Sequence, residues 1–314
     1  MHLTRILMTK IAAAGAAASA ATLPTVVSAQ TALPDLPMIG QPTYGSTGFQ
    51  PAGTEQASDV FWLDGFLLVI ITIITLFVTG LIAWVIIRYN AKRNPVPATF
   101  THNSPLEVAW TVIPIVILVF IGAFSLPVLF NDQEIPEADI TIKVTGKQWF
   151  WEYEYVDEGL AFESYMIGSS YLISDDEAAE NGVTPLVLTD EMLPYLAAAG
   201  YTEEQWLLAT DTSVVVPVGA TIVMQVTGGD VIHSWTIPAF GVKQDGVPGR
   251  LAELWFEAEE EGVYFGQCSE LCGMFHAYMP ITVKVVSQEV YDDWLALVLE
   301  QQELPSTQRT YTTW

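Results

Sequence analysis

Two long uncharged stretches constrain the fold of this chain more than any other feature. They cover residues 65–87 and 108–131, so they contain 23 and 24 residues. A helix needs about 20 apolar residues to cross the ~30 Å hydrocarbon core of a bilayer. Buried helices of a soluble protein are a weak alternative at this length. We therefore predict a transmembrane hairpin of two helices within residues 60–131.

The charges around these stretches indicate the topology. Arg88, Lys92 and Arg93 lie between the two stretches, whereas the outer flanks have almost no basic residues and several acidic ones. By the positive-inside rule, the connecting loop is cytoplasmic and both ends of the chain are outside.

Residues 1–29 independently predict export. Arg5 and Lys10 precede an Ala-rich apolar run, and residues 27–29 (Val-Ser-Ala) are typical of a signal-peptide cleavage site. An uncleaved tail is the alternative. Residues 30–59 are rich in Gly, Pro, Ser and Thr, and they predict an irregular arm outside the membrane.

Beyond the hairpin, short runs of Val, Ile, Thr and aromatic residues alternate with Gly and Pro. This pattern predicts a sandwich or barrel of short strands over residues 132–290. The expected strands are 140–144, 149–155, 213–216, 221–226, 233–237, 251–256, 263–266 and 281–286. An acidic insertion over about 168–208 interrupts them and reads as partly helical, at 190–198 and 202–208. A helix at 288–302 and a tail are expected at the C-terminus, with residues 291–314 as the last segment.

The negative charge is confined to the second part of the chain. Residues 131–314 carry 31 acidic and six basic side chains, whereas residues 1–130 carry five of each. Binding to nucleic acid by counterion release requires Lys and Arg, so no nucleic-acid partner is expected. An acidic surface favours encounter with a basic partner, although solubility alone explains it equally well.

Both cysteines of the chain lie in residues 266–280, GQCSELCGMFHAYMP. Cys268 and Cys272 are followed by His276 and Met279, and His233 begins another predicted strand. Thiolate, thioether and imidazole ligands together favour copper. A zinc site of two Cys and two His, or a Cys268–Cys272 disulfide in an oxidising compartment, are the alternatives. Met279 favours copper, because a thioether is a poor zinc ligand.

This stretch resembles the binuclear copper (CuA) motif of the cytochrome c oxidase subunit II family. The resemblance extends to residues 148–155, 230–235 and 245–250 and to the two predicted helices, and it is closest to alphaproteobacterial subunits of the aa3-like type. It implies a membrane-anchored all-β fold: a two-helix transmembrane hairpin followed by a cupredoxin-like Greek-key β-barrel, here with an acidic insertion.

The resemblance also implies ligands. Both cysteine sulfurs would bridge two copper ions, one histidine would bind each ion, and the methionine would be a weak axial ligand (Cys268, Cys272, His233, His276, Met279). Glu270 would give its backbone carbonyl to copper and its carboxylate to a magnesium or manganese ion shared with subunit I. Two coppers that share one electron change geometry little on reduction, which suits electron transfer. Met274 would not be a ligand.

Trp149 would be the point at which electrons arrive from cytochrome c, with Glu154, Glu163 and Asp230 in the docking surface. Trp149 and Trp151 are expected on one face of a strand, since side chains alternate. Core packing of the tryptophans and ordinary surface charge are the alternatives.

Glu107 begins the second apolar stretch. Ser104, Pro105 and Glu107 fit a capping box, with Ser104 as N-cap and Glu107 at the third helical position. The resemblance implies that Glu107 is the mouth of a cytoplasmic proton-uptake path, and both roles can coexist.

The function implied is that of the electron-accepting subunit II of a haem–copper terminal oxidase. Electrons would pass from cytochrome c through CuA to haem in subunit I, where oxygen is reduced to water and protons are pumped. Further oxidase subunits and the lipid bilayer are the other partners. The location implied is the bacterial inner membrane, with both mature termini and the CuA domain in the periplasm. A copper-free quinol oxidase subunit II, and a tethered copper chaperone or denitrification copper domain, are the alternatives.

Overall fold

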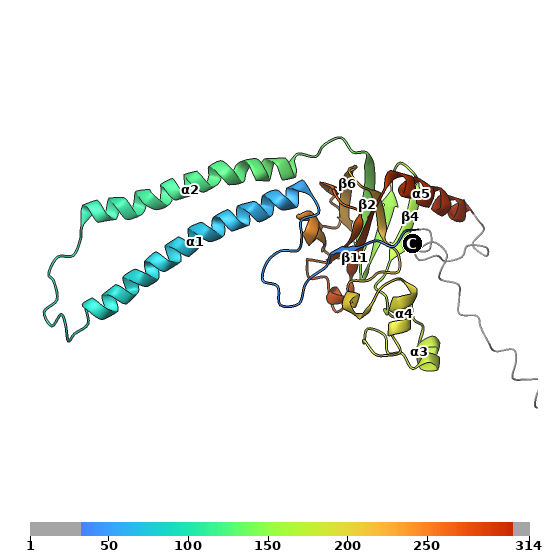
Figure 1. Cartoon of the computed structure of the whole chain (residues 1–314), viewed down its shortest axis with the longest axis horizontal. Helices are drawn as coiled ribbons and strands as arrows, with labels where there is room; N and C mark the ends of the chain where they lie inside the picture. The colour runs from blue at the N-terminus through green and yellow to red at the C-terminus, as the bar shows by residue number, and fades with distance from the viewer. Residues whose placement is uncertain (1–32, 304–314) are drawn as a thin grey trace, which may run out of the picture.

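The computed structural model describes residues 33–303. The predicted signal peptide and the tail beyond Glu303 lie outside the described residues. A long helical hairpin extends from one side of a β domain, and the insertion lies against the β domain (Figure 1).

The hairpin consists of α1 (Glu55–Arg88) and α2 (Ser104–Gln133). Their most apolar segments have mean hydropathies of 2.8 and 2.7, and no residue of these segments is buried within the chain. Trp62 and Phe66 of α1 pack against Phe120 and Phe124 of α2, with ring centroids 5.4–6.1 Å apart. The remaining apolar surface requires lipid or another subunit to cover it.

The N-cap of α2 differs from the prediction by one residue. Asn103, not Ser104, is the cap: its Oδ1 accepts from Leu106 N at 3.2 Å, and Glu107 Oε1 accepts from Asn103 N at 3.2 Å. Asn caps a helix as well as Ser does. The shift keeps Pro105 in the first turn, where its missing N–H leaves no hydrogen bond unmade.

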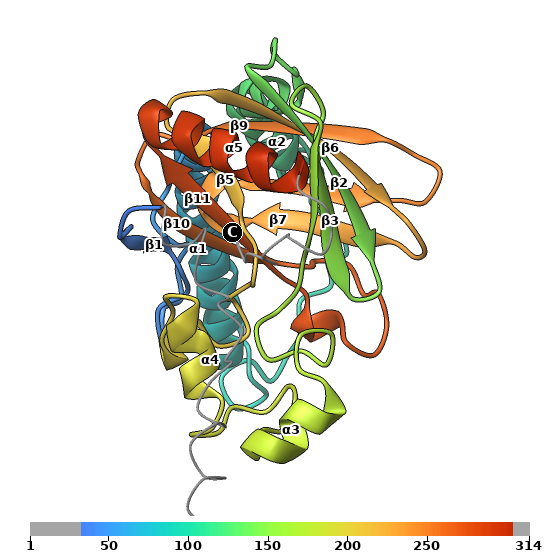
Figure 2. The same ribbon diagram turned by 90° about the vertical axis from the view of Figure 1, so that its right-hand side faces the viewer.

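The β domain is built from two sheets and a hairpin (Figure 2). One sheet has the order β1 (Met38–Gly40), β10 (Gly262–Gln267), β11 (Pro280–Val286), β5 (Val214–Pro217). The other has the order β4 (Leu160–Ser164), β3 (Phe150–Tyr155), β2 (Ile140–Lys147), β6 (Thr221–Gly228), β9 (Ala252–Glu257). The hairpin pairs β7 (His233–Ile237) with β8 (Val242–Gly246). The sequence prediction missed β1, β4 and β8. Side chains alternate between core and surface along β2, as expected for a strand with one buried face.

The core lies between the sheets and is rich in aromatic side chains. Trp151, Tyr153, Trp235 and Phe256 are at most 1% exposed. The C-terminal helix α5 (Gln288–Glu303) covers one end of this core through Trp294, which is also buried. The predicted β domain with a terminal helix is confirmed.

Hydrogen bonds fix the start of α1 to the β domain. Gly53 N donates to Ala239 O at 2.7 Å, and Thr54 Oγ1 donates to Phe240 O at 2.9 Å. These acceptors belong to η3 (Pro238–Phe240), and Gln56 Nε2 adds a bond to Trp255 O at 3.1 Å. The hairpin and the β domain are therefore joined at a defined angle.

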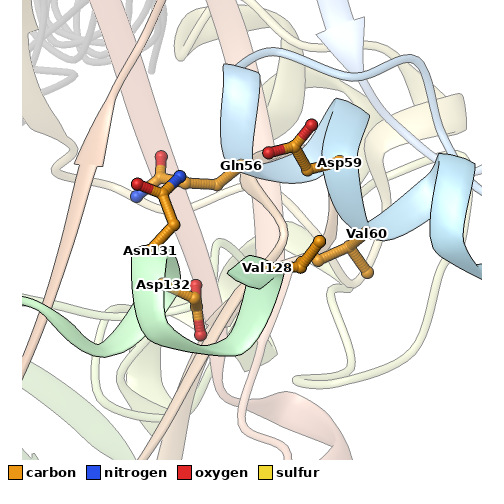
Figure 3. Close-up of a pocket in the computed structure, with 6 residues that line it drawn as sticks. All are labelled: Gln56, Asp59, Val60, Val128, Asn131 and Asp132. Carbon is orange, nitrogen blue, oxygen red and sulfur yellow. The ribbon is translucent and has the colours of Figure 1, made fainter. Parts of the chain in front are cut away.

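The first turns of α1 and the last turns of α2 meet beside this junction (Figure 3). Val60 and Val128 approach each other between the helices. Polar side chains surround them: Gln56, Asp59, Asn131 and Asp132. These polar side chains contrast with the apolar surface of the rest of the hairpin.

The insertion contains α3 (Asp175–Asn181), α4 (Leu193–Ala198) and the short helix η2 (Glu203–Gln205). The two helices predicted here are shorter than expected, because Pro194 begins α4 late and Leu207 adopts a positive φ of 69° after η2. Helix α3 was not predicted. The insertion packs on β10 through a cluster of buried side chains: Ile167, Leu196, Tyr201, Leu208, Val263 and Phe265.

A buried carboxylate lies where the insertion rejoins the β domain. Asp211 is 8% exposed, and its Oδ1 accepts from Tyr165 N at 2.7 Å and from Thr212 N at 2.8 Å. Burial raises the pKa of Asp211 to about 7 despite these bonds. In the unfolded chain the value is about 3.9. The folded protein therefore binds this proton more tightly, so the free energy of unfolding falls as pH rises from about 4 to about 7.

We expect Asp211→Asn to reduce this pH-dependent loss of stability. Asparagine keeps both hydrogen bonds, because both are made to Oδ1, but it cannot ionise. Unfolding measured at about pH 5 and about pH 8 should show a smaller difference in the variant than in the wild type. Asp190→Asn, an exposed change in the same insertion, is the control. Equal pH dependence in wild type and Asp211→Asn would show that the raised pKa of Asp211 is not the cause of the pH-dependent stability.

Candidate metal centre

The candidate ligands come from two segments that backbone hydrogen bonds hold together. His233 is the first residue of β7, and the loop between β10 and β11 contains the other four (Cys268, Cys272, His276, Met279). Cys268 N donates to Met279 O at 3.0 Å, which closes the loop on itself. Ser269 N donates to Ser234 O at 3.0 Å, which ties the loop to β7.

Each cysteine sulfur lies beside one imidazole nitrogen. The two Sγ atoms are 3.8 Å apart, so the cysteines are free thiols in this structure. Cys268 Sγ is 3.9 Å from Nδ1 of His233, and Cys272 Sγ is 3.5 Å from Nδ1 of His276. The donor atoms of His233 and the two cysteines all lie within 4.8 Å of one another. The alternative of a Cys268–Cys272 disulfide is thus not what this structure shows.

Two further donors lie in the same loop. Met279 is 1% exposed and belongs to the same core cluster as both cysteines. The carbonyl oxygen of Glu270 is 3.4 Å from Cys268 Sγ, whereas the Glu270 side chain is exposed. Met274 is 76% exposed and therefore lies outside the centre, as expected.

The electrostatics of the thiols favour a bound cation. Burial disfavours the thiolate of Cys268, but its hydrogen bonds, first that with His233, outweigh burial and lower its pKa to about 7. Burial and then the charge of Cys268 raise the pKa of Cys272 to about 12. Without a cation, Cys268 therefore begins to ionise near neutral pH while Cys272 stays protonated. A soft cation between the sulfurs would allow both to ionise, so these donors fit copper.

Asp230 and Gly146 position His233. Asp230 Oδ1 is 2.9 Å from Nε2 of His233, and a carboxylate accepts only, so the proton lies on Nε2 and Nδ1 faces the sulfur. A Cβ on Gly146 would lie only 2.6–2.8 Å from Cγ, Cβ and Cδ2 of His233, so only glycine leaves room for this side chain. His233 is fully buried, with Trp151 at 5.9 Å between ring centroids. The sequence interpretation did not identify Gly146.

Trp149 contacts the metal-binding loop directly. Its Nε1 donates to Cys272 O at 3.3 Å, and Gln148 Nε2 donates to the same oxygen at 2.8 Å. The Trp149 ring packs edge-on against Phe275, 4.8 Å between centroids. Gly273, at a φ of 122°, leaves room for both side chains. Trp149 is thus partly buried and one hydrogen bond from a cysteine.

Trp149 and Trp151 do not share a strand face, so this prediction was wrong. Lys147 pairs with Phe150, which makes Gln148 and Trp149 the two-residue turn between β2 and β3. Trp151 lies in β3 with its side chain in the core.

The structure brings one of the three predicted docking acids to the centre. Asp230 Oδ2 accepts from Gln148 N at 2.7 Å, in addition to the contact with His233. Glu154 and Glu163 are exposed on the neighbouring strands β3 and β4. Glu154 pairs with Lys143 at 3.0 Å, and Glu163 accepts from the Tyr165 hydroxyl.

Lys147 lies beside this acidic surface. Its Nζ is 2.9 Å from Glu152, and this hydrogen bond is the main reason why the pKa of Lys147 is raised. Glu107 is not part of the centre: it lies in the first turn of α2, at the end of the hairpin distant from the β domain.

Family models match most of the chain. The model of the cytochrome c oxidase subunit II periplasmic domain matches residues 140–193 and 184–286. The model of the transmembrane domain of the same subunit matches residues 42–128.

Curated proteins and a solved structure are also similar. Cytochrome c oxidase subunit 2 of Cereibacter sphaeroides is 61% identical over 90% of this chain and 89% of its own length. The probable cytochrome c oxidase subunit 2 of Rickettsia felis is 44% identical over 79% of this chain and 70% of its own length. The crystal structure of the periplasmic domain of cytochrome oxidase subunit II of Bradyrhizobium japonicum is 39% identical; it covers 53% of this chain and 98% of that one, with a TM-score of 0.40.

Proposed function

Because this chain belongs to the cytochrome c oxidase subunit II family, we propose that its metal centre is the binuclear CuA site known in that family. The chain is a subunit of a haem–copper terminal oxidase and has an electron-transfer role in it. The proposed ligands are the side chains of His233, Cys268, Cys272, His276 and Met279 with the carbonyl of Glu270. The observation that carries the proposal is the pairing of each cysteine sulfur with one imidazole Nδ1, around sulfurs 3.8 Å apart.

Copper bound there would supply one-electron redox chemistry with little change in geometry. The chain's own residues exclude water from the site and hold the proposed ligands rigidly. Burial of both cysteines, His233 and Met279 excludes water. The bonds from Cys268 N to Met279 O and from His233 to Asp230 hold the ligands in place. A site that is already rigid has little to rearrange when its charge changes.

Copper content and electron paramagnetic resonance of the purified oxidase test this proposal. An unpaired electron shared by two copper nuclei gives more hyperfine lines than one nucleus can give. Two coppers per chain with that pattern support the CuA site. Zinc in the centre, or a folded chain without copper as in a quinol oxidase subunit, would overturn it.

We propose that Trp149 receives electrons from cytochrome c and passes them towards Cys272, and that haem in subunit I is the next acceptor, where oxygen is reduced and protons are pumped. Trp149→Phe removes the 3.3 Å hydrogen bond to Cys272 O but keeps an aromatic ring. We expect electron transfer from cytochrome c to slow at least about tenfold, or ~1.4 kcal/mol of barrier, with copper content unchanged. Stopped-flow reduction measures the rate. A wild-type rate would contradict this role.

The docking surface is proposed to include Glu154, Glu163 and Asp230. Asp230 has a second, positioning role, since it also contacts His233. Glu270 is proposed to bind magnesium or manganese with subunit I, because its exposed carboxylate lies two residues from Cys268 and is a hard oxygen ligand.

Glu107 is proposed to open a proton-uptake path as well as to cap α2. Glu107→Gln keeps a side-chain oxygen that can accept from Asn103 N, so α2 should form normally. We expect proton uptake during turnover to slow about tenfold or more, as for loss of a general acid–base group. Proton uptake by the reconstituted oxidase measures this. Uptake at the wild-type rate would leave Glu107 with the capping role alone.

For location, we propose the bacterial inner membrane, with both mature ends and the β domain in the periplasm. The basic loop at residues 88–93 supports this orientation. The pairing of β1 with β10 also supports it, because strands on either side of the hairpin must meet on one side of the membrane. The proposed domains are 1–29 (signal peptide), 30–59 (arm), 60–131 (hairpin), 132–290 (CuA domain) and 291–314 (helix and tail).

A further inference from the structure

The first half of the insertion forms one wall of a shallow recess beside Trp149. The recess is lined by Trp149, Phe275 and Tyr278 and, from the insertion, by Ser169, Ser170, Tyr171 and Leu186. It is open to solvent and its interior volume is only about 10 Å³, far below the ~300–1,000 Å³ of typical small-molecule sites. Its size and openness suit side chains of another protein better than a cofactor.

Tyr171 joins the insertion to the turn that holds Trp149. Its hydroxyl donates to Gln148 O at 3.1 Å, and its ring lies 5.1 Å from that of Tyr165 and 6.0 Å from that of Phe150. Tyr171 is nevertheless 52% exposed. The aromatic surface around Trp149 therefore continues without a break onto the insertion.

The same wall contains an unsatisfied polar group. Ser169 is 7% exposed, and its hydroxyl has no hydrogen-bond partner within residues 33–303. Because this oxygen has almost no exposed surface, it belongs to the base of the wall and not to the face that a partner would touch.

Helix α3 lies in the sequence between the two segments of this wall, residues 169–171 and Leu186. The chain leaves the recess at Tyr171, forms α3, and returns at Leu186. Asp175, Asp176 and Glu180 of α3 are exposed. There is no Lys or Arg between residues 148 and 242, so no cation in this stretch offsets the negative charge.

We propose that Tyr171, Leu186 and α3 form part of the docking face for the electron donor, a c-type cytochrome whose contact surface would be complementary to this one: apolar at its centre and basic around it. The proposal rests on the proposed function of Trp149. An apolar centre with a charged rim is the usual anatomy of a protein interface. Opposite charges on the two rims raise the rate of encounter and orient the donor towards Trp149.

Two charge-matched variants of the complete oxidase test the proposal. The first, Asp175→Asn with Asp176→Asn, removes two charges from α3. The second, Glu203→Gln with Glu204→Gln, removes two charges from η2, which is fixed beside Gln41 by a 2.8 Å bond from Gln205 and lines no part of the recess. Oxidation of a purified lysine-rich c-type cytochrome is measured as a function of ionic strength. A small phenylenediamine donor, which needs no docking face, reports basal activity.

We expect the α3 variant to raise KM for the cytochrome about three- to tenfold at low salt and to weaken its salt dependence, because rim charges act on encounter. The η2 variant should change KM less than about twofold, and neither should change activity with the small donor. Tyr171→Ala should also raise KM, but with the salt dependence retained.

Equal KM values for the two charge variants would overturn the docking role of the insertion. Trp149→Phe separates this failure from failure of the proposed function. If Trp149→Phe oxidises the cytochrome at the wild-type rate, the site of electron transfer is wrong. If Trp149→Phe is slow while the two charge variants behave alike, only the role of the insertion is wrong.

Discussion

Replacing Cys272 by serine is expected to remove the copper centre while the β domain still folds. The Cys272 sulfur lies between the sulfur of Cys268 and Nδ1 of His276, so its loss separates the two halves of the centre. A hydroxyl is a hard, poorly ionised donor and does not replace a thiolate for copper. Changes outside the ligand set already lower metal affinity about 10- to 100-fold, so loss of this proposed sulfur ligand should exceed that range.

Copper content and the electron paramagnetic resonance spectrum of the purified oxidase measure the centre. The rate of cytochrome c oxidation measures its function. Both should be lost together. Met274→Leu is the matched control, because Met274 is in the same loop but 76% exposed. Met279→Leu should retain copper and alter the spectrum, since a thioether that binds weakly would tune a copper site more than hold it. A normal spectrum in Cys272→Ser would reject the proposed ligand set.

Gly146→Ala is expected to damage the centre without changing any ligand. Gly146 lies in β2 and has no positive φ, so alanine fits its backbone conformation. The new methyl group, however, would lie 2.6 Å from Cγ and 2.7 Å from Cβ of His233. These atoms are close to the His233 backbone and cannot swing away. The ring must move, and its bond to Asp230 and its approach to Cys268 must change with it.

We expect copper affinity to fall about 10- to 100-fold in Gly146→Ala, as when a group that orients a ligand is lost. Retention of copper against a chelator measures this, and a chemical unfolding curve shows whether the domain remains folded. Gly48→Ala is the control, because no atom lies within 4 Å of the position of its new Cβ. Unchanged copper retention in Gly146→Ala would show that the space beside His233 does not limit the site.

These two variants illustrate what the sequence could and could not predict. Cys268, Cys272, His276 and Met279 are identifiable because they are close in sequence and have rare, metal-specific chemistry. Gly146 carries no such signal, because its role depends on a pairing between distant strands. In the sheet, Gly146 of β2 pairs with Gly228 of β6, which is 82 residues away in the sequence. Contacts of this kind arise only when the sheet forms.

The misplacement of Trp149 has a similar origin. Residues 149–155 alternate in a way that is typical of a strand, and the turn at Gln148 and Trp149 lacks the Gly, Asn or Asp that usually mark two-residue hairpins. The pattern therefore gave no reason to begin the strand at Phe150 and not at Trp149. Helix α3 was missed because DDEAAEN has no apolar periodicity, and it is stabilised by its Ser174 cap.

Strand β1 was missed because residues 38–40 lie in an arm whose composition predicts loops. It adds to β10 through Met38↔Val263, a pairing that spans most of the described chain. No local pattern predicts it.

That pairing also has a consequence for how the protein is made. A ribosome produces β1 first, then both membrane helices, and only much later the strand that β1 joins. In the proposed orientation, residues 38–40 have no partner until Val263 and Tyr264 have also crossed the membrane. Without β1, β10 pairs only with β11, and its other edge is open. Strand β1 is therefore the last strand that this sheet can gain, and a chain shortened to begin after the hairpin would leave that edge of β10 uncovered.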